Sequence, residues 1–183
     1  TNDLIIPDMG TGKILRVNPD TGDITTIAEK FAAPMALKGG PDKMAYFPER
    51  GGAVYRLSLD GQKKDKLAQL PPGLDNLAIT PEGRLFITSY WDATVYKVAT
   101  DGSGKYEILF PTGPNSINGI VFKNGKVLIS DAIMIRILEK HKYTPTPLNA
   151  WATSGMPLPL GLADGPGDWV FWPDCIDNAV AMG

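Results

Sequence analysis

The chain has 183 residues, 43% of them hydrophobic, a composition typical of a globular domain with a sizeable core and not of a disordered segment. Eighteen basic and twenty acidic residues leave a formal net charge of -2, so neither nucleic acid nor a membrane surface is expected as a partner. The single cysteine, Cys175, excludes an internal disulfide and a cysteine-rich metal site, and no apolar run reaches the roughly 20 residues that span a bilayer.

Short segments of similar sequence recur about every 40 residues along the chain. In the first series a basic residue stands within a β-rich stretch at intervals of 40, 41 and 39 residues: Arg16, Arg56, Lys97 and Arg136. The second series, aligned on the turn that follows it, has intervals of 41, 42 and 42 residues: Met35, Asn76, Asn118 and Leu160. Repetition at this period is typical of β-propellers, whose blades are four-stranded antiparallel sheets.

Each repeat unit is predicted to contain four short strands, and the clearest unit has them at 77–80, 85–88, 94–98 and 106–110. We therefore predict an all-β fold, a β-propeller with about four and a half blades in this chain. A β-sandwich whose strands resemble one another by chance is the alternative. The predicted blades are approximately 1–33, 34–73, 74–116, 117–158 and 159–183.

The predicted strands at the two ends do not complete a blade. The first unit opens on its second strand, near Leu4, and the last unit stops after its third, near Met182. We therefore expect ring closure to need further residues of the natural chain, or association with another chain.

The two faces of the predicted propeller differ in their connections. One face carries tight hairpin turns such as 81–83, 101–102 and 123–125, whose residues suit hairpin geometry. The other, which we call the loop face, carries less regular connections such as 48–52, 89–93 and 131–133. Functional groups commonly lie on irregular loops held by a rigid scaffold, so the loop face is expected to carry the site.

Two stretches of the chain resemble a known family. Residues 74–88 read LDNLAITPEGRLFIT and residues 118–131 read NGIVFKNGKVLISD. Both are similar to blades of the gluconolactonase/regucalcin (senescence marker protein 30-like) family, and the repeat pattern extends the resemblance over essentially the whole chain. The resemblance implies a six-bladed propeller with lactonase activity and a divalent cation, often calcium, at the top of its central channel.

The resemblance also implies roles for individual residues. Asn118 matches the metal-binding Asn of the family's Asn-Gly motif, and Asp75 aligns with a position that contacts metal or substrate. Asn76 matches the adjacent acidic position. Leu160 departs from the pattern because the family carries a metal-binding Asp there, and the family's metal-binding Glu has no counterpart. The resemblance thus implies a calcium-type site at Asn118 and Asp75 with an incomplete ligand set.

Other candidates lie on the expected loop face. Tyr90 and Trp91 follow a predicted strand, where they could bind substrate by stacking or pack between blades. Asp131 is the candidate catalytic carboxylate that acts on water, and Asp8 and Asp174 occupy related places, either in a ring of carboxylates or as strand terminators.

Two classes of function remain open from the sequence. The first is hydrolysis of a lactone or ester in the central funnel, with Asn118 and Asp75 holding a cation and Asp131 acting on water. The second is a non-enzymatic propeller that binds a small molecule or a protein through the same loops, which apolar Met35 and Leu160 favour. For Asn118, Asp75 and Asn76 the structural alternative is a turn residue that satisfies nearby backbone groups. His141, between two lysines, is expected to be solvated.

Overall fold

The structure, a computed structural model, describes residues 2–110, 117–130, 135–139, 142–145, 161–174 and 179–182. Within these ranges every regular element is a β-strand, and the strands form five antiparallel sheets. Three sheets have four strands, and the first and the last have three. No helix in the described part of the chain has the length and apolar character that a bilayer crossing requires.

The strands follow in chain order. The first sheet contains β1 (Leu4–Asp8), β2 (Lys13–Val17) and β3 (Ile24–Ala28). The second contains β4 (Lys38–Gly39), β5 (Met44–Pro48), β6 (Ala53–Ser58) and β7 (Lys64–Gln69). The third contains β8 (Leu74–Ile79), β9 (Leu85–Ser89), β10 (Thr94–Val98) and β11 (Tyr106–Phe110). The fourth contains β12 (Ile120–Lys123), β13 (Lys126–Ser130), β14 (Ile135–Glu139) and β15 (Lys142–Pro145), and the fifth β16 (Ala163–Asp164), β17 (Val170–Asp174) and β18 (Ala179–Met182).

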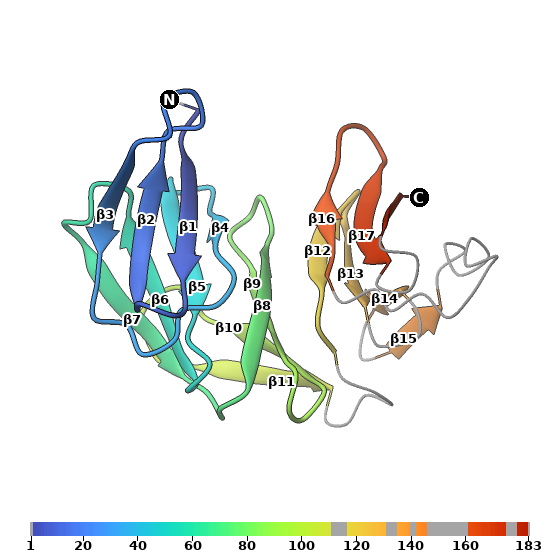
Figure 1. Ribbon diagram of the computed structural model, residues 1–183. Helices are drawn as coiled ribbons and strands as arrows, with labels where there is room; N and C mark the ends of the chain where they lie inside the picture. The colour runs from blue at the N-terminus through green and yellow to red at the C-terminus, as the bar shows by residue number, and fades with distance from the viewer. Residues whose placement is uncertain are drawn as a thin grey trace.

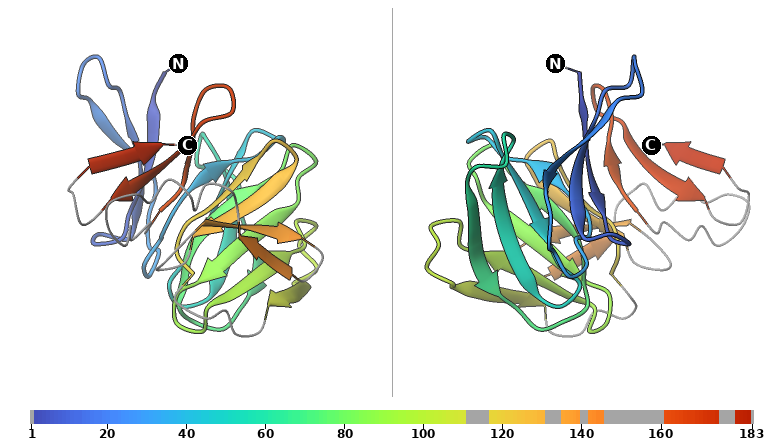
Figure 2. Two further views of the ribbon diagram at one scale, coloured as in Figure 1. Left: turned by 90° about the vertical axis from the view of Figure 1, so that its right-hand side faces the viewer. Right: turned by 60° about the vertical axis from the view of Figure 1, so that its left-hand side comes forward.

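The five sheets succeed one another along an open arc, with the first and the last sheet at its two ends (Figures 1 and 2). Each strand pairs with its neighbour in sequence, so every sheet is a meander. Strands β4, β8, β12 and β16 lie toward the middle of the arc, and the last strand of each sheet lies outside (Figure 1). This arrangement confirms the predicted β-propeller and excludes the β-sandwich.

Local sequence explains the hairpins between these strands. Between β12 and β13, Asn124 and Gly125 have positive φ values of 48° and 76°, the backbone of a type I′ turn. This turn matches the right-handed twist of the flanking strands, and Asn-Gly is its preferred sequence. The short connection fixes the register Lys123 to Lys126 and hence the start of the sheet.

The hydrophobic core lies in layers between consecutive sheets. Between the first two sheets Ile14 packs with Phe47 and Leu57, and the Phe31 ring meets the Phe47 ring edge-on with centroids 4.9 Å apart. Further buried clusters join the second sheet to the third, the third to the fourth and the fourth to the fifth. A sheet inside the arc therefore buries both faces, which explains its continuous apolar strands.

Two basic residues of the sequence repeat, Arg16 and Arg56, join neighbouring sheets. The Arg16 guanidinium donates to the Leu59 carbonyl of the second sheet at 2.5 Å, and Arg56 donates to the Thr100 carbonyl beyond β10 at 3.5 Å. Lys97 instead pairs with Glu107 of its own sheet at 3.6 Å. In two blades, therefore, the basic residue of the repeat donates a hydrogen bond to the last hairpin of the next blade.

Candidate functional site

A chain of backbone hydrogen bonds runs across the loop face. The Arg50 N–H donates to the Ala33 carbonyl at 3.0 Å, the Gly73 N–H to the Arg50 carbonyl at 2.7 Å, and the Tyr90 N–H to the Gly73 carbonyl at 2.9 Å. These bonds join connections from the first three sheets. The predicted residues Asp75, Asn76, Tyr90 and Trp91 lie on or next to this chain, which we call the rim.

Asp75 and Asn76 lie in a β-bulge at the start of β8. Leu74 pairs with Ser89 and Leu77 pairs with Ile87, so β8 has one residue more than β9 over this stretch. A bulge turns side chains away from the regular alternation and often lies beside a functional site. Both bulge residues are half-buried.

Asp75 is the carboxylate with the clearest perturbation at the rim. Burial raises the pKa of the Asp75 carboxyl above its ordinary value of 3.8, and the positive charge of Arg50 partly opposes this rise. The Asp75 carbonyl also accepts the Ala36 N–H at 3.4 Å, which ties β8 to the segment before β4. A half-buried carboxylate with a raised pKa is a more effective proton acceptor near neutral pH than a solvated one.

The structure brings Asn76 and Asn118 together through Thr88. The buried Thr88 hydroxyl accepts the Asn76 N–H at 3.1 Å and lies 3.0 Å from the Asn118 carbonyl oxygen, to which it donates. The Asn76 side chain turns back onto its own strand, where Oδ1 accepts the Leu77 N–H at 2.9 Å. The Asn76 side-chain oxygen therefore has the structural role that the sequence offered as the alternative, which is to satisfy a nearby backbone group.

The backbone around Asn118 is held by Ser130. The Asn118 N–H donates to the Ser130 carbonyl at 3.1 Å, and the Gly119 N–H donates to the Ser130 hydroxyl at 3.0 Å. A Cβ on Gly119 would lie 2.6 Å from backbone atoms of Gly161 and Leu162 in the next blade. Asn118 is thus placed by a close contact between two blades that only glycine permits.

Tyr90 and Trp91 are exposed at the rim. The Trp91 ring lies against Gly73, where an added Cβ would come within 2.6 Å of its Cγ, yet 66% of the residue remains accessible. Tyr90 is also exposed. Of the two predicted fates, stacking on a ligand fits this exposure better than packing between blades.

The remaining acidic candidates have different outcomes. Asp8 holds its own loop, accepting the Gly10 N–H at 3.0 Å and the Thr11 hydroxyl at 2.5 Å, and these bonds lower the pKa of its carboxyl. Asp8 therefore acts as a strand terminator. The predicted positions that lie outside the described residues, or whose side chains do, are Asp131, Asp174, Leu160, His141 and Cys175. Met35, also predicted at the channel, is half-buried, and its N–H donates to the Pro48 carbonyl at 2.9 Å.

Sequence reasoning missed Arg50 and Thr88. Arg50 stands 41 residues, one repeat period, before Trp91, so the interval already indicates an equivalent loop position in the preceding blade. Thr88 stands 42 residues before Ser130, and both hydroxyls accept a backbone N–H at the start of their blade. Neighbouring Glu49 is only 7% exposed and accepts the Ala32 N–H at 2.7 Å, which indicates a structural role.

The described rim residues do not fit a divalent cation. Asp75 offers one carboxylate and Asn118 one amide, whereas calcium takes six to eight oxygen ligands. In the described part of the chain no three His, Cys, Asp or Glu side chains come together as a possible metal site, and the Arg50 charge acts on Asp75. The calcium site at Asn118 and Asp75 therefore stays a prediction, and the chemistry below uses no step through a metal.

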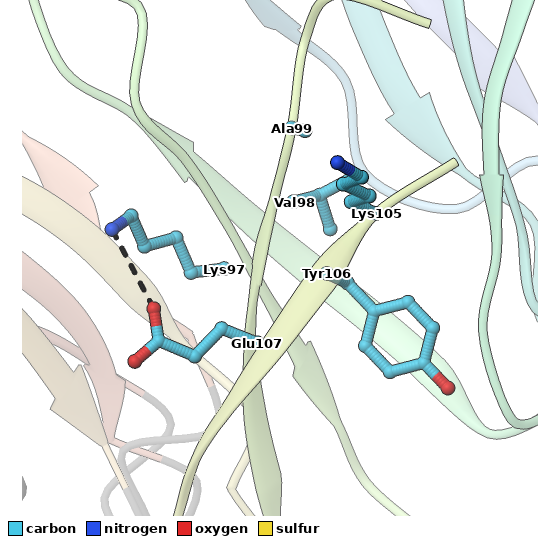
Figure 3. Close-up of a pocket in the computed structure, with 6 residues that line it drawn as sticks. All are labelled: Lys97, Val98, Ala99, Lys105, Tyr106 and Glu107. Carbon is cyan, nitrogen blue, oxygen red and sulfur yellow. Dashed lines mark ion pairs between the residues drawn. The ribbon is translucent and has the colours of Figure 1, made fainter. Parts of the chain in front are cut away.

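A separate hollow of about 260 Å³ lies on the outer strands of the third sheet (Figure 3). Lys97 and Glu107 form their ion pair on one side of β11, and Tyr106 points to the other side. It contains no residue predicted for the site. The rim and this hollow are therefore independent features.

No protein-family model matches the sequence, and no curated protein does. Solved structures are similar in fold. Virginiamycin B lyase from Staphylococcus aureus, solved with quinupristin, has a TM-score of 0.76 and 17% identity over 98% of this chain and 62% of the lyase. A chain of the nidogen/laminin complex has a TM-score of 0.81 and 16% identity, over 98% of this chain and 70% of that chain.

A gluconolactonase from Xanthomonas campestris is also similar, with a TM-score of 0.71 and 16% identity over 98% of this chain and 68% of that enzyme. The chain spans less than two thirds of the length of the lyase. At these identities the likeness extends to the fold, so what the chain shares with all three proteins is the β-propeller.

Proposed function

We propose that the rim of the loop face hydrolyses a lactone or a similar ester. The observation that carries the proposal is the half-buried Asp75 with a raised carboxyl pKa, which lies in a bulge, feels the charge of Arg50 and follows Gly73, the residue that contacts the exposed Tyr90 and Trp91. The fold similarity to a gluconolactonase and the Asn-Gly motif at Asn118 support the same chemistry.

The proposed reaction uses groups of this chain. Tyr90 and Trp91 bind the substrate ring, and Asn118 contacts its polar groups together with the Asn76 Nδ2, since the Asn76 Oδ1 is bonded to the Leu77 N–H. Asp75 accepts a proton from water as the water oxygen bonds to the carbonyl carbon. The Arg50 guanidinium stabilises the oxyanion, the ring C–O bond then breaks, and the proton passes from Asp75 to the leaving alkoxide. Asp131, the predicted catalytic carboxylate, stays a candidate for the same proton transfer.

The direct test is ring opening of a panel of sugar and aliphatic lactones, followed by pH-stat titration. Asp75→Asn is expected to lower kcat/KM by about 10²- to 10⁴-fold, the usual effect of losing a general base. Asp101→Asn, in a hairpin on the opposite face, is the matched control and is expected to leave the rate unchanged. Absence of turnover by the unaltered chain on the whole panel contradicts the proposal.

The calcium prediction has its own measurement. Lactone turnover is followed during calcium titration and after removal of metal by a chelator. Turnover that needs calcium, and that loses calcium affinity in Asn118→Ala, supports a cation at Asn118 and Asp75. Turnover that a chelator leaves unchanged contradicts the cation and leaves the hydrolase proposal intact.

The exposure of Tyr90 and Trp91 also favours a second candidate, binding of a small molecule without turnover. In that case a lactone or sugar ligand raises the melting temperature, and Trp91→Ala removes the rise while no product forms. Binding that is unchanged in Tyr90→Ala and Trp91→Ala contradicts this candidate.

A further inference from the structure

The inner strands of four consecutive sheets line a small, partly open cavity away from the rim. Its volume is about 160 Å³, and it is lined by residues of β4, β8, β12 and β16, the strands nearest the middle of the arc (Figure 1). None of Arg50, Asp75, Tyr90 or Asn118 lines it. We call this cavity the channel site.

The wall of the channel site combines apolar side chains with free strand edges. Ile79 of β8 and Phe122 of β12 are half-buried lining residues. Both strands stand at the edge of their sheets and pair with a neighbour on one side only. A strand edge presents unpaired backbone N–H and C=O groups, so polar contacts are available beside the apolar surface.

The charged groups at the channel site leave one positive charge in excess. Lys123 is almost buried, and its ammonium donates to the Asp164 carboxylate at 2.5 Å and to the Gly165 carbonyl at 2.6 Å, so these two charges compensate each other. Lys38 of β4 is half-buried and forms no ion pair within the described part of the chain. A half-buried ammonium without a counter-ion favours an anionic ligand.

We propose that the channel site binds a short aliphatic monocarboxylate. The carboxylate pairs with Lys38, and the hydrocarbon part lies against Ile79 and Phe122. The volume equals about five water molecules, so an acid with about four to six carbon atoms fills the site. This site is independent of the rim and of any reaction there.

The experiment is titration of the isotopically labelled chain with butyrate, followed by amide NMR shifts. A ligand of this size with one ion pair is expected to bind with a Kd on the order of 1 mM. The largest shifts are expected at Lys38, Ile79 and Phe122. Butyramide, the neutral isostere, is expected to bind at least tenfold more weakly.

Single substitutions test the contributions of Lys38 and Asp164 to butyrate binding. Lys38→Gln is expected to weaken butyrate at least tenfold, and Lys105→Gln, at the outer hollow, is the matched lysine control (Figure 3). Asp164→Asn removes a negative charge from the wall and is expected to tighten butyrate binding by a few fold. Weaker butyrate binding in Asp164→Asn, equal binding of butyramide, or shifts confined to the rim each overturns the proposal. Lactone turnover is measured on the same variants, and its loss or retention leaves the channel result unaffected.

Discussion

At the scale of single residues, the half-buried Asp75 carboxyl that we propose as the general base also lowers the stability of the fold when it ionises. Burial raises the pKa of its carboxyl, which means that the folded chain prefers the protonated form. The stability from this preference is complete below the ordinary pKa of 3.8 and is lost as the pH rises through the higher pKa of the folded state. The ionised carboxylate at neutral pH is therefore retained at the expense of stability, as functional groups often are.

Asp75→Asn is accordingly expected to be more stable than the unaltered chain at pH 7 and no more stable at pH 3. The reason is that asparagine cannot ionise in the half-buried bulge. Urea unfolding midpoints at the two pH values measure the difference, and a midpoint difference that does not change with pH contradicts this account of Asp75.

Gly119→Ala tests the close approach that places Asn118. The added Cβ would lie within 2.6 Å of the backbone of Gly161 and Leu162, so two blades must separate slightly. Overpacking of this kind costs about 1–3 kcal/mol, measurable by urea unfolding. Gly51→Ala, where an added Cβ meets nothing within 4 Å, is expected to be nearly neutral. Equal effects of the two changes contradict the close contact.

At the scale of elements, the repeat position occupied by Arg56 and Lys97 connects sequence to blade packing. Arg56 is 22% exposed, donates to Asp65 through two nitrogens and reaches Thr100 in the next blade. Lys97 is 45% exposed and stays within its own sheet. The same place in the repeat thus carries an inter-blade contact in one blade and a surface ion pair in the next.

Arg56→Met is therefore expected to lower the free energy of unfolding by about 1–2 kcal/mol, because Asp65 loses charge-assisted hydrogen bonds. Lys97→Met is the control and is expected to cost less than about 0.5 kcal/mol, as exposed ion pairs usually do. Chemical unfolding of both variants gives the comparison. A free-energy cost for Lys97→Met that equals or exceeds the cost for Arg56→Met contradicts this account of Arg56.

At the scale of the whole molecule, the two sheets at the ends of the arc expose apolar side chains. Leu4 and Ile6 alternate with Ile5, which packs inward, and Val180 and Met182 lie on the outer face of the last sheet. Val180 is 72% exposed. Apolar sheet faces of this kind favour association, so both ways of closing the ring that the sequence predicts, further residues of the natural chain or another chain, would cover them.

Sedimentation velocity over a range of concentrations is expected to show reversible self-association. Val180→Lys is expected to weaken it by about tenfold, since burial of one aliphatic side chain contributes about 1.5 kcal/mol. Ile108→Lys, exposed on an outer strand of the third sheet, is the matched control and is expected to have no effect. A chain that stays monomeric at high concentration contradicts closure by a second copy of the chain.

The architecture could be predicted from the sequence, because a 40-residue period of turn residues and β-rich segments permits few folds. The Asn-Gly turn at Asn124 and the basic residue that recurs in each repeat, beginning with Arg16, could also be recognised in the sequence, since both depend on local residue types. The equivalent positions of Asn76 and Asn118 in consecutive blades followed from the period alone, and in the structure the Thr88 hydroxyl joins their backbones.

Which charged side chains interact with one another follows from the packing of the blades and could not be predicted from the sequence. The bulge at Asp75, the charge of Arg50 upon it and the position of Lys38 at the channel site depend on how neighbouring blades approach. A sequence specifies that a residue is acidic or basic and when it recurs. The burial that shifts a pKa, and the distance over which two charges interact, arise only when blades distant in sequence pack together.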